Sequence, residues 1–224
     1  IYPLPSPTTL LGALAYPYLR KNSGIEAVNI GGKLYSPAVK ILEKVSYVAA
    51  GSEGYLPSRE VERVHQVIYM RKQHWEKLDL YYSIGVRGNA HYLDDNLYLL
   101  YIVDDKGLAD YAYGIVRVGR KEGLVVVDEV IVEEVNKTVK SIGKGIFRTL
   151  FYFPTKIAIC PEGNALRMPM PILIKENFSE EALAPVTEEY CIPRLGEVVS
   201  ELKSPGALIS VGGYNIPVPK EVVS

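Results

Sequence analysis

The stretch IYPLPSPTTLLGALAYPYL, residues 1–19, joins a proline-rich lead to a helical pattern. Proline holds φ at about −65° and favours extended backbone in the residue before it, so residues 1–6 are expected to be extended. Ser6 or Thr8 can then cap a helix over residues 8–20, in which leucines recur at helical spacing. The stretch therefore predicts a loop and helix of the kind that follow a β-strand, although no strand precedes it.

A second group of segments predicts a β-α-β unit. Residues 96–103 form a short apolar run between aspartates, which is typical of a buried strand. Residues 108–118 carry apolar side chains at helical spacing, and Gly119 stands where a C-terminal glycine cap belongs. Residues 124–127 and 130–132 are valine-rich and are expected to be strands.

Together with the α-β pattern of residues 1–50, these segments predict an α+β fold. Only one leading strand is missing from β-α-β-β-α-β, the ferredoxin-like arrangement. Either that first strand is absent, or a short extended segment at residues 1–4 is all that remains of it.

The remaining segments indicate the domain organisation. Residues 55–92 are rich in Tyr and Arg and could form a long hairpin or a protruding insertion. From about residue 146 the chain has many prolines and short β-like runs. We therefore expect a domain over residues 1–145 that carries the insertion, followed by a small β-rich region over residues 146–224.

Composition narrows the functional classes. The 224 residues are 48% hydrophobic, which is ample for a packed core, and no apolar run reaches the roughly 18 residues that cross a bilayer. Cys160 and Cys191 are too few for a disulfide framework or a metal site, so reduced thiols and a cytoplasmic location are expected. The sequence has no GxGxxG, phosphate-loop or HExxH motif, and its three histidines lack metal-ligand spacing. It therefore indicates no cofactor, no metal and no small-molecule catalysis.

Charge is segregated along the chain although the net charge is only −1. Residues 137–148 hold four cations and no acid, residues 128–134 hold four acids, and residues 176–190 hold five glutamates. Such segregation is typical of one face for an anion and another for protein neighbours. A solvated charged surface would look similar.

Two glycine-bracketed basic loops are candidate phosphate sites: RVGRKEG, residues 117–123, and SIGKG, residues 141–145. Glycine lets backbone N–H groups approach a phosphate while Lys or Arg neutralises it, and Gly119 is expected to need a positive φ. An ordinary surface turn is the alternative. In the insertion, aromatics lie among basic residues and could stack on unpaired bases, unless the hairpin packs on the body.

The opening motif PLPSPTTLLGALAYPYL resembles the N-terminal signature of the CRISPR-associated protein five family, in the repeat-associated mysterious protein superfamily. GIVRVGRKEGLVVVDEV (114–130) and FRTLFYFP (147–154) resemble blocks of its archaeal type I-A branch. The resemblance implies a ferredoxin-like, RNA-recognition-motif-like core with a protruding β-hairpin thumb and a small C-terminal β region.

The same resemblance implies a role in antiviral defence. Such a protein is a non-catalytic subunit of Cascade that binds the 5′ handle of the CRISPR RNA. It caps the filament of backbone subunits, which belong to the CRISPR-associated protein seven family, and it contacts the large subunit, with no membrane involved. The candidate RNA-binding residues are Ser6, Thr8, Thr9, Arg63, Arg71, Lys72, Trp75, Arg117, Gly119, Arg120, Lys121, Gly143, Lys144 and Gly145.

Two other functions remain open from the sequence. One branch of the family cleaves the precursor RNA itself without metal, and His65, Tyr69, Lys72 and His74 could supply the general base and acid for that reaction. The other alternative is an interaction module with no RNA role.

Overall fold

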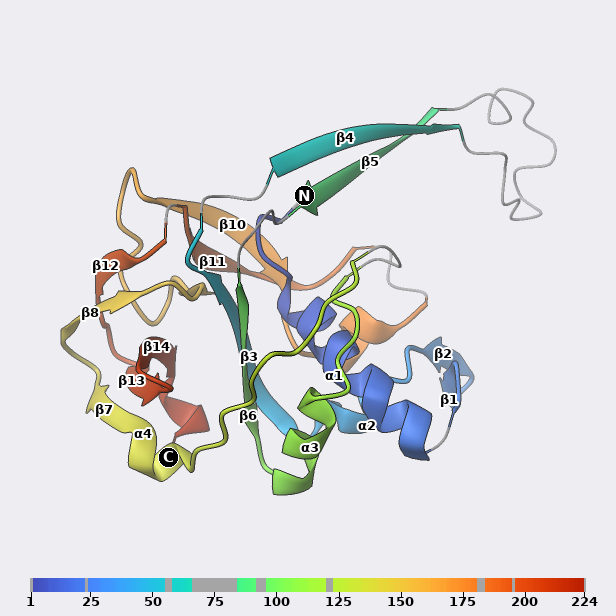
Figure 1. Cartoon of the computed structure of the whole chain (residues 1–224), viewed down its shortest axis with the longest axis horizontal. Helices are drawn as coiled ribbons and strands as arrows, with labels where there is room; N and C mark the ends of the chain where they lie inside the picture. Colours follow the sequence, from blue (N-terminus) through green and yellow to red (C-terminus); the bar gives the residue numbers. More distant parts are fainter. Residues whose placement is uncertain are drawn as a thin grey trace. The chain divides into compact units, whose positions relative to one another are not determined.

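The computed structural model describes residues 2–22, 24–54, 58–65, 84–91, 96–119, 123–180, 184–194 and 196–223, with backbone alone for 58–65 and 84–91 (Figure 1). The chain divides into two compact units. One comprises Ile1–Pro3 with Leu56–Asp95, and the other comprises Leu4–Tyr55 with Asn96–Ser224. The predicted division at residue 145 stays a prediction.

The described residues of the first unit form one antiparallel pair of strands. Strand β4 (Ser58–His65) pairs with β5 (Ile84–His91) in a register that runs from Ser58 opposite His91 to His65 opposite Ile84. This pairing is that of the two arms of a hairpin, as expected for the insertion. The projection of a thumb from the body stays a prediction.

The second unit begins with the predicted helix. Helix α1 (Pro7–Asn22) starts directly after Ser6, and Arg20 and Lys21 lie in its last turn, where cations suit the helix dipole. All four leucines of the helical pattern are buried, which confirms the helix expected over residues 8–20: Leu10, Leu11, Leu14 and Leu19. Residues 2–6 form no strand.

Helix α1 packs against the antiparallel pair β3 (Val45–Ser52) and β6 (Leu97–Val103). The Tyr101 hydroxyl on β6 donates a hydrogen bond to the Leu10 carbonyl of α1 at 2.9 Å. The strand expected at residues 96–103 is confirmed as β6, but only Leu100 and Ile102 of it are buried, and its other residues are half-buried. Before β3 the chain forms the small hairpin of β1 (Val28–Ile30) with β2 (Lys33–Tyr35), and then the one-turn helix α2 (Val39–Leu42).

The β-α-β pattern expected after β6 is wrong beyond its first strand. In place of a helix over residues 108–118 there are the 3-10 turn η3 (Lys106–Leu108) and the one-turn helix α3 (Ala109–Ala112). Residues 124–127 and 130–132 are not strands. Their only ladder contact within the described chain is the bridge between Arg117 and Leu124. A valine-rich run becomes a strand only where another strand accepts its hydrogen bonds.

The rest of the chain is β-rich, as expected of residues 146–224. After helix α4 (Val135–Thr138) come three antiparallel sheets with strand orders β10-β11-β9, β12-β8 and β14-β13-β7. The strands are β7 (Val139–Ile142), β8 (Ile146–Thr149), β9 (Phe153–Pro154), β10 (Ala165–Pro171), β11 (Thr187–Pro193), β12 (Val198–Glu201), β13 (Gly206–Val211) and β14 (Tyr214–Pro219), with 3-10 turns η4 (Lys175–Phe178) and η5 (Lys220–Val222). The fold is therefore α+β with antiparallel sheets, while the ferredoxin-like arrangement is not confirmed.

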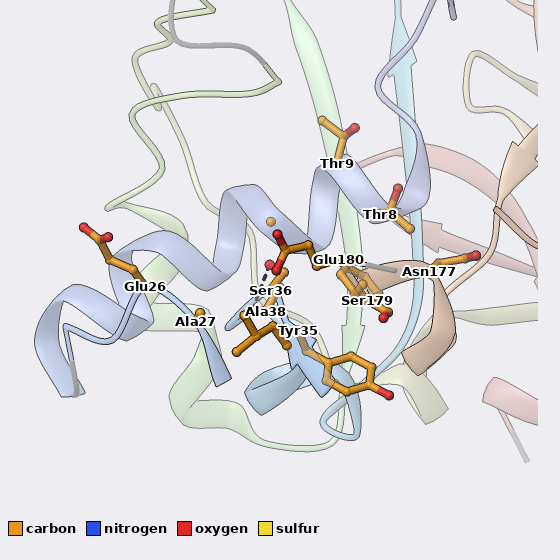
Figure 2. Close-up of a pocket in the computed structure, with 13 residues that line it drawn as sticks. Thr8, Thr9, Glu26, Ala27, Tyr35, Ser36, Ala38, Asn177, Ser179 and Glu180 are labelled. Atoms are coloured by element: carbon orange, nitrogen blue, oxygen red, sulfur yellow. Dashed lines mark hydrogen bonds between the residues drawn. The ribbon is translucent and has the colours of Figure 1, made fainter. Parts of the chain in front are cut away.

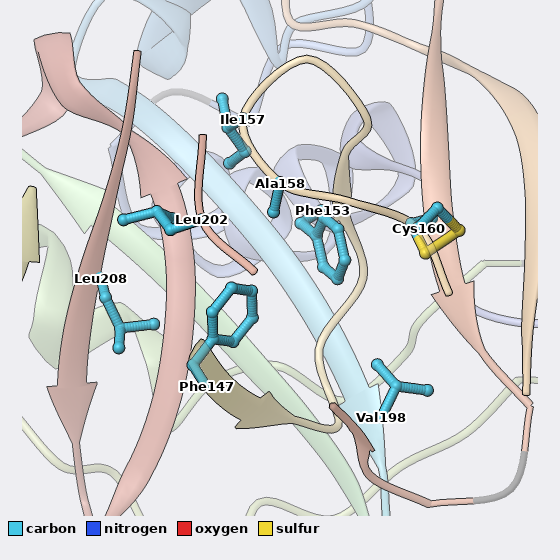
Figure 3. Packing of buried hydrophobic residues seen from close by; sticks show 9 residues of the cluster. Phe147, Phe153, Ile157, Ala158, Cys160, Val198, Leu202 and Leu208 are labelled. Atoms are coloured by element: carbon cyan, nitrogen blue, oxygen red, sulfur yellow. A yellow bond between two sulfur atoms is a disulfide. The ribbon is translucent and has the colours of Figure 1, made fainter. Parts of the chain in front are cut away.

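A buried cluster holds these sheets together (Figure 3). The rings of Phe147 and Phe153 meet edge to face with centroids 6.0 Å apart. Beside them Cys160 and Cys191 form a disulfide, with Cα atoms 5.4 Å apart. The expectation of two reduced thiols is therefore wrong. Because β9 pairs with β11 at Phe153 and Cys191, the topology brings together two cysteines that the sequence separates by 31 residues.

Candidate nucleic-acid interface

An exposed tyrosine on the second half of α1 lies beneath two guanidinium groups. The Arg20 guanidinium carbon lies 5.9 Å from the centroid of the Tyr16 ring, and that of Arg117 lies 5.6 Å from the same centroid. Both distances fall within the range of cation–π attraction. The Tyr16 side chain is 40% exposed, so part of its surface remains open to a ligand. We call Tyr16, Arg20 and Arg117 the Tyr16 patch.

Further tyrosines and lysines surround the end of the same helix. Tyr18 and Tyr111 meet edge to face with ring centroids 5.2 Å apart. The ammonium of Lys21 lies 5.4 Å from the Tyr111 centroid, and that of Lys44 lies 6.0 Å from the Tyr18 centroid. The end of α1 is therefore a mixed basic and aromatic surface.

One acid takes part in this surface. Lys44 Nζ and Asp105 Oδ2 are 2.9 Å apart. The hydrogen bond from Lys44 holds the pKa of Asp105 below its usual value, and the backbone N–H of Gly107 adds to this effect. The same bond raises the pKa of Lys44. Lys44 is therefore already partnered, whereas the described structure gives Arg20 and Arg117 no carboxylate within ion-pair distance.

The turn after α3 positions Arg117 over α1. Gly114 lies so close to α1 that an added Cβ would stand 2.6 Å from Cβ of Pro17. Asn22 Nδ2 donates to the Tyr111 hydroxyl at 3.0 Å, which fixes α3 against the end of α1. Gly119 has φ +86°, which confirms the expected positive φ, and the Val118 N–H donates to the Gly123 carbonyl at 2.9 Å. The positive φ belongs to this turn and not to a helix cap, because the helix already ends at Ala112.

Three of the predicted RNA-binding residues, Ser6, Thr8 and Thr9, lie at the start of α1, away from the Tyr16 patch on the second half of the helix. Ser6 is buried, and its Oγ lies 3.2 Å from Thr8 Oγ1 and 3.0 Å from Thr9 Oγ1. Figure 2 shows Thr8 and Thr9 on the first turn of α1, where they line a pocket of about 440 Å³. Glu26 and Glu180 line the same pocket, and carboxylates repel a phosphate. Phosphate binding at Ser6, Thr8 and Thr9 stays a prediction.

The loop at Gly143, Lys144 and Gly145 joins β7 to β8. Gly143 has φ +73° and Gly145 has φ +127°. The Gly143 N–H donates to the Gly206 carbonyl at 2.7 Å, and the Gly145 carbonyl accepts from the Leu202 N–H at 2.8 Å. Lys144 is exposed. The Gly143 amide thus has a partner within the fold, so any phosphate contact here would depend on Lys144, and it stays a prediction.

The structure does not place the other predicted RNA-binding residues next to the Tyr16 patch. Arg63 lies on β4, in the first unit, and its contact with RNA stays a prediction. Arg71, Lys72, Trp75, Arg120 and Lys121 lie outside the described residues, as do Tyr69 and His74 of the alternative nuclease site.

Sequence reasoning missed Tyr16 and Arg20. Residues four apart on a helix share a face, so a tyrosine followed four residues later by an arginine at a helix end was a usable signal. The second cation above the ring, Arg117, comes from a turn about a hundred residues away in the sequence and could not be assigned to Tyr16 in advance.

The described residues contain no group of three or more His, Cys, Asp or Glu side chains arranged to hold a metal ion. In the same part of the chain, no helix has the length and apolar character needed to span a bilayer.

The fold matches that of a CRISPR protein. The crystal structure of a CRISPR protein from Archaeoglobus fulgidus aligns with a TM-score of 0.53 at 16% identity, covering 96% of this chain and 86% of that one. At this identity the likeness concerns the fold alone. No protein-family model matches the chain.

Two curated relatives make the class more specific. Both come from Saccharolobus solfataricus: the CRISPR system aCascade subunit Cas5 1, which is 27% identical, and the CRISPR-associated protein Cas5 3, which is 28% identical. Each match spans 205 residues and covers 84% of both chains. Together with the shared fold, these relatives support a Cas5-type CRISPR-associated protein, and the resemblance predicted from the sequence is confirmed.

Proposed function

We propose that this chain is a non-catalytic subunit of a type I-A Cascade that binds the 5′ handle of the CRISPR RNA. The proposal includes a cytoplasmic location and contacts with the backbone and large subunits. The relatives' names support a place in such a complex. The disulfide does not by itself follow from this location, because most cytosolic proteins keep their thiols reduced.

The observation that carries the proposal is the Tyr16 patch. An exposed aromatic ring can stack on an unpaired base, and guanidinium groups bind phosphate oxygens in a bidentate fashion. Tyr16, Arg20 and Arg117 bring both kinds of contact to one place. Since single-stranded RNA presents a base and a phosphate at every nucleotide, the patch suits a handle segment that crosses the end of α1.

The test is the binding of a synthetic 5′-handle RNA, measured against salt concentration. Arg20→Ala with Arg117→Ala should weaken binding and lower the slope of log K against log salt by about 1.4, because each phosphate contact contributes about 0.7 for single strands. Tyr16→Ala should cost about 1–3 kcal/mol of binding free energy, whereas Tyr16→Phe should retain most of the stacking.

A matched control removes two exposed lysines from the C-terminal region, Lys203→Ala with Lys220→Ala, which changes the net charge equally. It should leave the salt slope nearly unchanged. Equal slopes in the two double variants would contradict the Tyr16 patch as the RNA site. RNA cut into discrete products that disappear in His65→Ala or His74→Ala would instead favour the endoribonuclease.

A further inference from the structure

One segment crosses the second unit between two fixed points, and within the described chain the bridge at Leu124 is its only strand contact. Residues 124–132 run from the bridge at Leu124 toward helix α4 (Figure 1). Side chains alternate between exposed and half-buried along residues 124–128, as they do in a half-covered strand. Leu124 is 77% exposed and Val126 is 86% exposed. We call residues 124–132 the free strand.

The backbone of the free strand has unused hydrogen-bonding capacity. The Val125 N–H donates to the Val116 carbonyl at 3.1 Å. Beyond it, within the part of the chain that the structure describes, the N–H groups of residues 126–132 have no partner in the fold. Extended backbone with open N–H and C=O groups is a template for strand addition.

Both ends of the free strand are held by the body of the unit. At one end lies the Arg117–Leu124 bridge. At the other, Ile131 covers Gly212, where an added Cβ would stand 2.6 Å from Ile131 Cδ1, and the Gly212 N–H donates to Glu133 Oε1 at 3.1 Å. A segment held extended in this way loses little further conformational freedom when it pairs.

Charge selects the partner. Residues 123–134 contain Asp128, Glu129, Glu133 and Glu134 and no Lys or Arg. These acids repel the phosphates of RNA, and they would oppose one another across a pair of identical strands. A strand that carries lysine or arginine would meet opposite charge and cover the exposed valine and leucine side chains.

We propose that the free strand adds to the edge strand of another protein, by β-strand pairing with a segment that places apolar side chains opposite Leu124 and Val126 and a basic side chain opposite Asp128. This surface is distinct from the Tyr16 patch and does not require RNA binding. Strand pairing supplies the backbone hydrogen bonds, and the acids determine which edges are accepted.

The test uses the full chain and a capped octapeptide of valine and lysine, with its lysines placed to meet Asp128 and Glu129 and its valines to meet residues 124–127. Amide hydrogen exchange of residues 126–132 should slow by about tenfold or more at saturating peptide. The same peptide methylated on alternate backbone nitrogens keeps its charge but cannot form the ladder, so it should give no protection.

Charge-reversal variants test the selection. Asp128→Lys with Glu129→Lys should abolish the protection. The matched variant is Glu197→Lys with Glu201→Lys. Glu197 precedes β12 and Glu201 is its last residue; both acids are exposed, and β12 is already paired with β8, so this variant should retain the protection. The proposal is overturned if the peptide gives no protection or if the methylated peptide protects equally. It is also overturned if protection grows with protein concentration in the absence of peptide, because the partner would then be a second copy of this chain.

Discussion

Buried tyrosine hydroxyls in the second unit have unequal surroundings. The Tyr101 hydroxyl donates to the Leu10 carbonyl and so joins β6 to α1. The Tyr47 and Tyr152 side chains are more deeply buried, and their hydroxyls have no hydrogen-bond partner among the described residues. Burial raises the pKa of all three side chains, so each stays neutral well into the alkaline range. Of these three hydroxyls, only that of Tyr101 makes a hydrogen bond within the described residues.

Removing the Tyr101 hydroxyl and removing the Tyr152 hydroxyl should therefore affect the free energy of unfolding differently. Tyr101→Phe should lower the free energy of unfolding by about 0.5–1.5 kcal/mol, because the Leu10 carbonyl loses its side-chain donor. Tyr152→Phe should leave that free energy unchanged or raise it, because it removes a buried polar group without a partner. Urea denaturation at neutral pH measures both variants, and a larger loss in Tyr152→Phe than in Tyr101→Phe would contradict this account.

At the scale of elements, the Tyr16 patch depends on how closely the turn after α3 approaches α1. Gly114 has no room for a side chain, since an added Cβ would also stand 3.3 Å from the Tyr111 carbonyl oxygen. The proline ring at position 17 is rigid and cannot rotate away. The position of Arg117 three residues later is thus tied to a glycine that makes no contact with a ligand.

Gly114→Ala should push the turn away from α1. We expect a loss of about 1–3 kcal/mol in the free energy of unfolding, as for overpacking elsewhere. Weaker RNA binding should accompany it, because Arg117 leaves the Tyr16 ring. Gly12→Ala, on an open face of the same helix, is the control and should stabilise by up to about 1 kcal/mol through helix propensity. Thermal unfolding and titration with handle RNA measure the stability and the RNA affinity of both variants. Equal stability and equal RNA affinity in Gly114→Ala and Gly12→Ala would contradict the role given to Gly114.

At the scale of the whole molecule, a covalent link spans the β-rich part of the second unit. The disulfide closes a loop of 31 residues that includes all of β10 and the turn η4. Both cysteines are buried in the cluster of Figure 3, so the link also fills the core. Sheets of two and three strands have small faces, and the disulfide offsets part of the entropy of assembling them.

Breaking this link should destabilise the chain strongly. Loop-closure entropy for a loop of this length predicts a loss of about 3–4 kcal/mol for Cys160→Ala with Cys191→Ala. A reducing agent should lower the unfolding midpoint of the native chain in the same direction and should have no effect on the double variant. Differential scanning calorimetry with and without reductant checks this, and a native chain indifferent to reductant would contradict a stabilising role.

The features that followed from the sequence are local. Helix α1 was predictable because its leucines recur at the helical period, and β6 because an apolar run stands between aspartates. The positive φ of Gly119 was predictable because glycine pays no steric cost in that region of φ and ψ. Each of these patterns is set by neighbours within a few residues. Arg117 belonged to the expected site for the same reason, as part of a glycine-bracketed basic turn.

The features that only the tertiary structure decided are contacts between residues far apart in the chain. Periodicity could not show that Arg117 lies over Tyr16, or that Cys160 meets Cys191. It also favoured strands at residues 124–127 and 130–132, where the described fold supplies no ladder beyond the bridge at Leu124. Local propensity is a property of a segment, whereas pairing, stacking and cross-linking require two segments whose meeting depends on how the intervening chain folds.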